Sequence, residues 1–456
     1  MMKKKIPRLL ISAPASGTGK TMVTCALLKA FSDQGKKIAS FKCGPDYIDP
    51  MFHKEVLGID SYNLDVFLCG EDHVRTLLVE NGADADLALM EGVMGYYDGL
   101  AGISTEASAY DVARITETNT VLVMDCKGLS VSIIPYLQGF VNYKENSFIK
   151  GVILNRLSPM MYERMKTMIE RETPLKVYGY LPVMKDCEIE SRHLGLHLPT
   201  EEARTKESLE KLSEQAMRSI DLQGLYELTM ESSELEGSEK TEKDSSDSHE
   251  RKVRIAIAMD EAFCFIYKEN LNLLEKYGAE IVPFSPIAAK ELPENIDGLV
   301  LYGGYPELHA EALSKNDSMR KSIRQAVQNG MPCIAECGGF MYLMEGIRTE
   351  SGKCYEMVGV LSGISYHTSS LKRFGYVTLS EGTVFGENVG EIPAHEFHYY
   401  DAECCGEAFH AQKPLSNRNW RCMVSTDHIF AGYPHIHYAG NEKIAEAFIK
   451  ACRKWK

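Results

Sequence analysis

The sequence predicts an α/β protein made of two doubly wound domains, each built on a parallel sheet wrapped by helices. Three observations lead to this fold class. Short apolar runs alternate with helical patterns up to residue 230, a strongly acidic stretch follows, and the alternation then starts again. A chain of 456 residues is also too long for one hydrophobic core, which favours more than one domain.

The predicted elements follow this alternation along the chain. In the first half the sequence predicts strands at residues 8–13, 37–41, 87–90, 120–124 and 148–154, and a helix at 22–31. In the second half it predicts strands at 253–259, 280–284, 298–302 and 331–334, and a helix at 270–277. Strands that alternate with helices indicate parallel pairing. Because the acidic stretch separates the two alternating regions, we expect one domain at residues 1–230 and another at 252–456.

Residues 231–251 are predicted to be an acidic linker rich in Ser and Glu. Positions 231–250 contain one aliphatic side chain, Leu235. Such a segment cannot bury enough apolar surface to offset the entropy lost on ordering. An acidic interaction tail is less favoured because the segment lies between two ordered patterns.

Composition excludes several classes of function. The net charge of −14 argues against nucleic acid as a partner, since phosphate binding needs clustered Lys and Arg. We expect neither a signal segment nor a membrane span, because the basic start leads into a strand pattern. The 13 cysteines are scattered, which is typical of reduced thiols in a cytoplasmic protein.

A phosphate-binding loop is predicted where the first strand meets the first helix. Residues 12–21 carry the second half of a Walker A motif, although Pro14 replaces its first glycine. Backbone N–H groups, a lysine and a hydroxyl are what phosphates and magnesium require, and the residues concerned are Gly17, Thr18, Gly19, Lys20 and Thr21. This pattern predicts a P-loop NTPase-type domain that binds ATP with Mg²⁺. A glycine-rich turn with an incidental Lys-Thr is the alternative.

Acidic side chains follow two further strands of the same predicted sheet. Glu91 ends the strand at 87–90, and Lys42, Asp46 and Asp49 follow the strand at 37–41. The carboxyl ends of parallel strands form the ligand edge of such a sheet. We therefore expect magnesium ligands or substrate-binding groups here, although Asp46 and Asp49 both lie beside proline and could be turn formers.

Cys337 is the candidate nucleophile of the second domain. It lies between the strand at 331–334 and a helical pattern, and Gly338 and Gly339 follow it. Small residues permit the sharp turn of a nucleophile elbow, and the helix N-terminus is expected to favour the reactive thiolate. The alternative is a buried structural cysteine, a common fate of an unpaired Cys.

Several segments together resemble the cobyrinate a,c-diamide synthases. They are KCGPDYIDP (42–50), EGVMGYYDG (91–99), SRHLGL (191–196), EAFCF (261–265), GGYPE (303–307), AECGGFMYL (335–343) and AHEFH (394–398). The resemblance implies a dethiobiotin-synthetase-like P-loop domain joined to a flavodoxin-like, triad-type class I glutamine amidotransferase domain. It also implies ATP-dependent amidation of two corrinoid carboxylates with glutamine nitrogen, in cobalamin biosynthesis.

The resemblance also assigns roles in the first domain. Asp46, Asp49 and Glu91 become metal or substrate-activating carboxylates, with Thr21 as a further magnesium ligand, and Lys42 and Tyr47 are expected to face the corrinoid. Asn155 corresponds to the adenine-reading position, although a plain polar turn fits equally well. Residues 191–196 are expected to help close the site.

In the second domain the resemblance pairs Cys337 with a histidine. A tyrosine two places upstream selects His435, and His437 stands where other class I amidotransferases carry a glutamate, so the third triad member is absent or replaced. The N–H of Gly338 and one from the pair Gly303–Gly304, for which we take Gly304, are expected to form the oxyanion hole. His395 and His398 are interpreted as structural or interdomain.

Other functions stay open at this point. The same amidation chemistry could act on nickel-sirohydrochlorin or hydrogenobyrinate, which are alternative substrates. A P-loop regulatory ATPase with a vestigial amidotransferase domain is disfavoured by the Cys337–His435 pair, and a stand-alone ATPase or sensor by the acidic loop. The expected partners are cobyrinate, glutamine and ATP, and both a monomer and a homodimer are compatible with the sequence.

Overall fold

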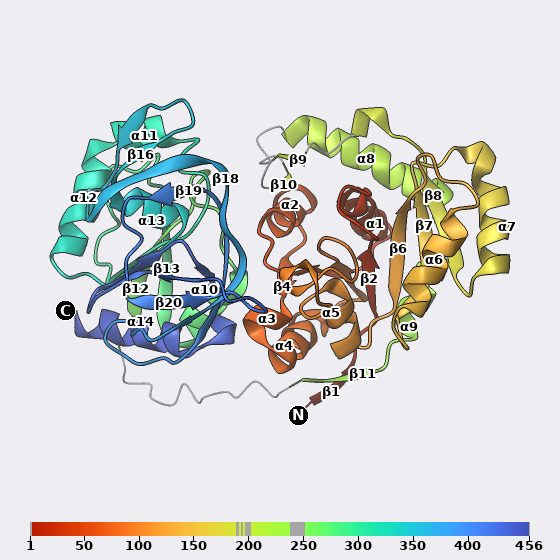
Figure 1. Ribbon diagram of the computed structural model, residues 1–456, viewed down its shortest axis with the longest axis horizontal. Helices are drawn as coiled ribbons and strands as arrows, with labels where there is room; N and C mark the ends of the chain where they lie inside the picture. Colours follow the sequence, from red (N-terminus) through yellow and green to blue (C-terminus); the bar gives the residue numbers. More distant parts are fainter. Residues whose placement is uncertain (1, 188–190, 193–194, 197–201, 238–250, 456) are drawn as a thin grey trace. The chain divides into compact units, whose positions relative to one another are not determined.

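The computed structural model describes residues 2–187, 191–192, 195–196, 202–237 and 251–455 (Figure 1). The chain divides into two compact units, Met1–Thr241 and Glu242–Lys456, and each is described by itself below. Both units are α/β, as the alternation of strand and helix patterns predicts.

The first unit is built on a parallel sheet. Its strand order is β4-β3-β5-β2-β6-β7-β8, with every pair parallel. The strands are β2 (Arg8–Ser12), β3 (Ile38–Cys43), β4 (Ser61–Leu64), β5 (Leu87–Glu91), β6 (Thr120–Asp125), β7 (Ile149–Asn155) and β8 (Lys176–Leu181). Every residue of β2 and β5 is buried, which explains why these central strands are continuous apolar runs in the sequence.

Helices connect these strands, since a parallel pair needs a crossover. They are α1 (Lys20–Asp33), α2 (Ile48–Leu57), α3 (Val66–Cys69), α4 (Glu71–Gly82), α5 (Ala109–Ile115), α6 (Ile133–Asn142), α7 (Tyr162–Glu172), α8 (Glu202–Ser219) and α9 (Leu222–Met230). Short 3₁₀ turns lie at Leu100–Gly102, Pro159–Met161 and Lys185–Cys187, and β9 (Ser191–Arg192) pairs antiparallel with β10 (Gly195–Leu196). The predicted closing segment 191–196 thus forms two short strands, with residues 193–194 outside the described part.

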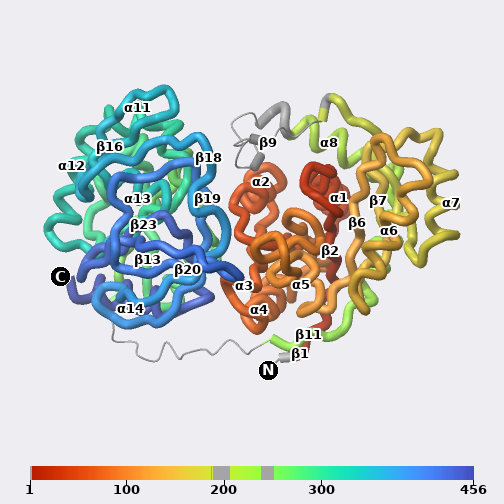
Figure 2. The backbone as a smooth tube through the Cα atoms, viewed as in Figure 1, coloured from red at the N-terminus to blue at the C-terminus, as the bar shows by residue number. Residues whose placement is uncertain are grey.

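The predicted linker begins later than the sequence indicates. Residues Glu234–Gly237 form β11, which pairs antiparallel with β1 (Met2–Lys5), so the two segments lie side by side near the N-terminus (Figure 2). Burial alternates along β11, and Leu235 is only 4% exposed. The buried guanidinium of Arg8 donates to the carbonyl of Ser233 at 2.9 Å. The start of this segment is therefore held by Leu235, which lies in strand register, and by the buried Arg8. Residues 238–250 lie outside the described part.

The second unit contains a six-stranded sheet ordered β13-β12-β14-β15-β23-β22. All its pairs are parallel except β22 with β23. The strands are β12 (Val253–Ala258), β13 (Ala279–Phe284), β14 (Gly298–Leu301), β15 (Cys333–Glu336), β22 (Val424–Ser425) and β23 (Ile429–Gly432). The helices are α10 (Lys268–Lys276), α11 (Ala310–Lys315), α12 (Asp317–Gln328), α13 (Gly338–Leu343) and α14 (Lys443–Lys454).

A second, mainly antiparallel sheet in this unit is absent from the sequence prediction. Its main path is β17-β16-β18-β19-β24, and β20 and β21 extend it from β18. The strands are β16 (Met344–Arg348), β17 (Cys354–Glu356), β18 (Leu361–Ser380), β19 (Ile392–Ala402), β20 (Phe409–Gln412), β21 (Asn419–Cys422) and β24 (His435–Ile436), and a 3₁₀ turn follows at Tyr438–Gly440. Polar residues interrupt β18 and β19, so neither is a simple apolar run, but β19 alternates strictly between buried and half-buried positions.

Two further features bear on the class of protein. Among the described residues, we find no helix with the length and apolar character needed to cross a lipid bilayer. In the same part of the chain, all thirteen cysteines are unpaired thiols.

Candidate functional site

The phosphate loop connects β2 to α1 and takes its shape from two glycines. Gly17 and Gly19 have φ angles of 77° and 90°, in the left-handed region that glycine tolerates best. A Cβ at Gly19 would lie 2.1 Å from Nδ2 of Asn155, whereas a Cβ at Gly17 would meet nothing within 4 Å. Gly17 is therefore needed for its backbone conformation alone, whereas Gly19 is needed for its conformation and because a side chain there would clash with Asn155.

Asn155, at the end of β7, holds this loop. Its Nδ2 donates to the carbonyl of Thr18 at 2.8 Å, and the next residue, Arg156, donates to the carbonyl of Gly17 at 3.2 Å. Arg156 also forms an ion pair with Asp125 at 2.5 Å. The side chain predicted to read adenine thus supports the loop from beneath, and adenine recognition stays a prediction.

Lys20 and Thr21 point toward the end of β5. The Nζ of Lys20 donates to the carbonyl of Met94 at 2.6 Å, and the hydroxyl of Thr21 donates to Oε1 of Glu91 at 2.6 Å. Burial, with the nearby charge of Lys42, lowers the pKa of Lys20 to about 8. Burial, together with the charge of Asp49, raises the pKa of Glu91 to about 7. A bound ligand can therefore readily change the protonation of Lys20 and Glu91.

Lys42 lies between two carboxylates. It is 3% exposed, it approaches Oε1 of Glu91 to 3.0 Å, and it forms a very short contact with Asp49. Burial opposes its charge, yet the charges of Asp49, Glu91 and Asp46 outweigh this effect and hold the pKa of Lys42 well above its usual value. In this structure Lys42 neutralises the acidic cluster.

Asp46 and Tyr47 shape the start of α2. Oδ1 of Asp46 accepts hydrogen bonds from the backbone N–H groups of Ile48 and Asp49 at 2.8 and 3.2 Å, while its other oxygen is 3.8 Å from Nζ of Lys42. Tyr47 is only 8% exposed. The turn-forming interpretation of Asp46 is therefore confirmed, while its role as a metal or substrate ligand stays a prediction. Among the described contacts, none joins Asp46 to Thr21, its predicted fellow magnesium ligand.

Sequence reasoning missed two residues of this cluster. Asn63, on β4, donates to the carbonyls of Gly44 and Asp46 at 2.9 and 2.7 Å and so holds the acidic loop. His53 is fully buried, with Nε2 3.8 Å from Oε2 of Glu91. Its position four residues after Asp49, on the same helical face, is the signal that could have identified it.

The residues present are compatible with a magnesium-bound nucleotide. Within the described residues there is no group of three or more His, Cys, Asp or Glu side chains arranged around a metal position. However, Oε2 of Glu91 and Oγ of Ser12 are buried and lack hydrogen-bond partners in that part of the chain. Such oxygens, together with the hydroxyl of Thr21, are the hard ligands that Mg²⁺ takes beside phosphates and water.

The second unit places Cys337 on a strained turn between β15 and α13. Its φ and ψ are 46° and −102°, a conformation that costs about 1–3 kcal/mol for a residue other than glycine. Its N–H donates to the carbonyl of Gly432 at 2.8 Å. A Cβ at Gly339 would lie 1.9 Å from the carbonyl oxygen of Leu301, so the helix can approach β14 this closely only with glycine there. The geometry is that of a nucleophile elbow.

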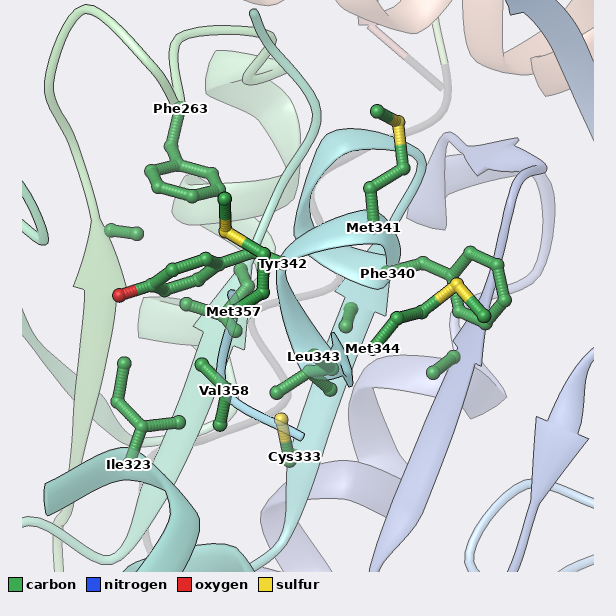
Figure 3. Close-up of a cluster of buried hydrophobic side chains, with 14 of the residues drawn as sticks. Phe263, Ile323, Cys333, Phe340, Met341, Tyr342, Leu343, Met344, Met357 and Val358 are labelled. Atoms are coloured by element: carbon green, nitrogen blue, oxygen red, sulfur yellow. The ribbon is translucent and has the colours of Figure 1, made fainter. Parts of the chain in front are cut away.

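Packing of α13 maintains this strain. Phe340, Met341, Tyr342 and Leu343 are all buried in one apolar cluster, surrounded by side chains from several elements (Figure 3). Because this short helix is anchored on every side, Cys337 cannot relax without displacing buried side chains.

The glycine pair and His435 meet beside the elbow. A Cβ at Gly338 would lie 3.0 Å from the backbone nitrogen of Gly304, so the two predicted oxyanion-hole residues are neighbours. A Cβ at Gly303 would lie 2.5 Å from Cε1 of His435, so the imidazole covers this glycine. His437 instead packs on Tyr267, with ring centroids 4.7 Å apart, and its Nε2 is 3.8 Å from Glu269. Of the two histidines, His435 adjoins the glycine pair.

The electrostatics of this site differ from the sequence prediction. Burial, with the charges of Glu307 and Glu396, raises the pKa of the Cys337 thiol. Burial, with the charge of His398, lowers the pKa of His435 to about 3. The helix N-terminus acts in the predicted direction, because the N–H of Gly338 lowers the pKa of the thiol, but burial outweighs this effect and the pKa is raised. Burial therefore favours the neutral forms of both the Cys337 thiol and the His435 imidazole.

His398 and Glu396 form a buried pair on β19. Nε2 of His398 is 2.8 Å from Oε2 of Glu396, and the His398 ring stacks on Tyr433 with centroids 4.1 Å apart. His395 is the register partner of His435 across β19 and β24. The structural interpretation of His398 fits this packing, whereas Glu396 escaped sequence reasoning. Its place between two histidines of the AHEFH segment is the available signal.

Fold and site together define a class: a nucleotide-binding P-loop domain joined to a glutamine amidotransferase domain. Residues 9–196 match the CobQ/CobB/MinD/ParA nucleotide binding domain family, and residues 254–443 match the CobB/CobQ-like glutamine amidotransferase domain family. These ranges contain the phosphate loop and the elbow, respectively.

Full-length relatives narrow this class. The chain is 38% identical to the cobyrinate a,c-diamide synthase of Caldanaerobacter subterraneus subsp. tengcongensis over 97% of its own length and 98% of that protein's. It is 39% identical to the protein of that name from Clostridium acetobutylicum, over 95% and 97% of the two chains. The chain belongs to the cobyrinate a,c-diamide synthase family.

Solved structures align with less than half of the chain. PurLQS from Thermotoga maritima shares 15% identity at a TM-score of 0.31, over 44% of this chain and 98% of that one. The signal recognition particle receptor FtsY from Elizabethkingia anophelis shares 14% at a TM-score of 0.32, over 45% and 66%. These likenesses are too distant to bear on activity.

Proposed function

We propose that this protein amidates the a and c side-chain carboxylates of cobyrinate, using ATP and Mg²⁺ and taking ammonia from glutamine. The observation that carries the proposal is the presence of both half-sites in one chain: a formed phosphate loop facing Glu91, and a strained Cys337 beside a glycine pair and a histidine. Relatives that match nearly the whole chain carry the name cobyrinate a,c-diamide synthase.

The first half of the chemistry activates a carboxylate. A carboxylate oxygen is a poor leaving group, so phosphoryl transfer from ATP converts the carboxylate to an acyl phosphate that ammonia can attack. The loop amides and Lys20 bind and orient the phosphates, and Thr21 and Glu91 would hold Mg²⁺, which would offset phosphate charge. A cation beside the buried Oε2 of Glu91 would favour the ionised form of this carboxyl group, whose pKa burial raises. Lys42, Asp46, Tyr47 and Asp49 are proposed to bind the corrinoid substrate.

The second half releases ammonia from glutamine. His435 takes the proton of Cys337, and the sulfur attacks the side-chain amide carbon to form a γ-glutamyl thioester. The N–H groups of Gly304 and Gly338 stabilise the oxyanion that develops on the amide oxygen. The protonated histidine then donates its proton to the departing nitrogen, and water hydrolyses the thioester.

The test compares nitrogen donors in three proteins. The wild type is incubated with ATP, Mg²⁺ and cobyrinate, hydrogenobyrinate or nickel-sirohydrochlorin, with glutamine or ammonium chloride, and the mass gain of the macrocycle is followed. Two mass steps on cobyrinate support the proposal. Cys337→Ala should lose the glutamine-supported reaction while retaining the ammonia-supported one, and Lys20→Ala should lose both.

Matched controls remove the same functional groups elsewhere. Cys404→Ala deletes an exposed thiol of the second unit, and Lys29→Ala deletes an ammonium group on the same helix as Lys20. Both should behave as the wild type. If Cys337→Ala still used glutamine, or if Lys20→Ala still amidated the macrocycle with either donor, the corresponding assignment would be wrong.

A further inference from the structure

Glu396 carries a buried acceptor that the reaction described so far does not use. The side chain is 1% exposed, and its Oε1 is buried without a hydrogen-bond partner among the described residues. A buried carboxylate oxygen left in this state costs about 1–3 kcal/mol or more. A ligand that donates a hydrogen bond to Oε1 would recover this free energy, so the atom marks a binding position.

The other oxygen of Glu396 is fixed. Nδ1 of His398 lies 2.5 Å from the carbonyl of Tyr400, which can only accept, so Nδ1 carries a proton. Nε2 lies 2.8 Å from Oε2 of Glu396, and one proton joins these two atoms whichever of them holds it. In both cases Oε1 keeps its lone pairs. His398, together with Arg373, whose Nε lies 3.9 Å from the same Oε2, therefore sets the direction of the carboxyl group and leaves Oε1 as an acceptor.

Glu396 lies on the buried side of β19, and a chain of contacts leads from it to the elbow. Buried positions alternate along the strand, so Glu396 shares a face with His398 and Tyr400, and Tyr400 belongs to the same apolar cluster as Cys337. The His398 ring stacks on Tyr433, and the preceding residue, Gly432, accepts the N–H of Cys337 at 2.8 Å. A continuous path of contacts thus links Glu396 to the nucleophile. Burial is the main cause of the raised pKa of the Cys337 thiol, and the charges of Glu307 and Glu396 add to it.

We propose that Oε1 of Glu396 binds the α-ammonium group of glutamine and so selects an α-amino acid amide over a simple amide. The inference rests on the proposed glutaminase function of Cys337. Glutamine carries its ammonium group a short aliphatic chain away from the amide that the sulfur attacks, and a buried carboxyl oxygen is the complementary acceptor. The bound ammonium would also offset the negative charge beside the thiol. The thiolate then becomes accessible once glutamine is in place.

The experiment measures ammonia release from glutamine and from glutaramate, the analogue without the α-amino group. The wild type should prefer glutamine by about 10- to 100-fold in kcat/KM, the range for one hydrogen bond to a charged group. Glu396→Gln keeps the shape and the bond to His398 but removes the charge, so the preference should fall about tenfold or more. Glu391→Gln, which removes an exposed carboxylate just before the same strand, should keep the wild-type ratio.

The ratio decides the outcome even if absolute rates change. An unchanged preference in Glu396→Gln, or a wild type that does not discriminate, overturns the inference. If that variant fails to fold, Glu396→Asp withdraws the same charge by one methylene group and should also reduce the preference. Failure of the proposed function would look different, because glutamine would then not be hydrolysed at all or would still be hydrolysed by Cys337→Ala.

Discussion

Gly17→Ala and Gly19→Ala make a sharp comparison, because the two glycines share a loop and a left-handed backbone but differ in surroundings. Alanine at either φ, 77° or 90°, costs about 1–2 kcal/mol of stability. At Gly17 the added methyl group meets nothing within 4 Å, so this is the whole expected effect.

At Gly19 the methyl group would lie 2.1 Å from Nδ2 of Asn155, and the amide must move away. This movement breaks its 2.8 Å bond to the carbonyl of Thr18, and an unsatisfied buried group costs about 1–3 kcal/mol more. Gly19→Ala should therefore be roughly 2 kcal/mol less stable than Gly17→Ala, which is about 4–8 °C in the melting temperature of a unit of this size. The KM for ATP should also rise more in Gly19→Ala.

Melting followed by circular dichroism gives the measurement. Both tryptophans, Trp420 and Trp455, lie in the second unit, so their fluorescence serves as an internal control that should not move. Adding Asn155→Ala to Gly19→Ala removes the clashing amide and should reduce the extra cost of the alanine. Equal melting temperatures for the two single variants would refute the steric reasoning.

Two other predictions concern stability. Arg8→Ala should destabilise the first unit by about 3 kcal/mol in urea unfolding, because it leaves the buried carbonyls of Thr116 and Ile6 without their donor; a loss below about 1 kcal/mol would contradict this. Burial raises the pKa of Glu336 to about 8 from its ordinary 4.5, so the folded state holds a proton that the unfolded chain has released. The contribution of Glu336 to the stability of the second unit should therefore be fully present below pH 4.5 and be lost as the pH rises through about 8. Glu336→Gln should flatten this slope, and an unchanged slope in the pH series of melting temperatures would exclude Glu336 as its source.

Local patterns predicted most of the elements that carry the site. The strands before the phosphate loop, before Glu91 and before Cys337 were all placed within two residues, because a buried parallel strand is a continuous apolar run. The long strands β18 and β19 were not predicted. Their stability depends on each other and on β24, pairings that no short window of sequence contains.

Short stretches of the chain were enough to predict the α/β class, the phosphate loop and the strand-to-helix turn at Cys337. The class follows from alternating local patterns, and the two turns need particular small residues at fixed spacing. The packing of the whole chain decided that Asn155 supports the loop, that Lys42 neutralises Glu91 and Asp49, and that Oε1 of Glu396 is buried without a hydrogen-bond partner among the described residues. It also decided that burial raises the pKa of the Cys337 thiol and outweighs the opposite effect of the helix N-terminus. The physical reason is common to all four: burial and charge pairing depend on residues that are distant in sequence and become neighbours only when the sheets assemble.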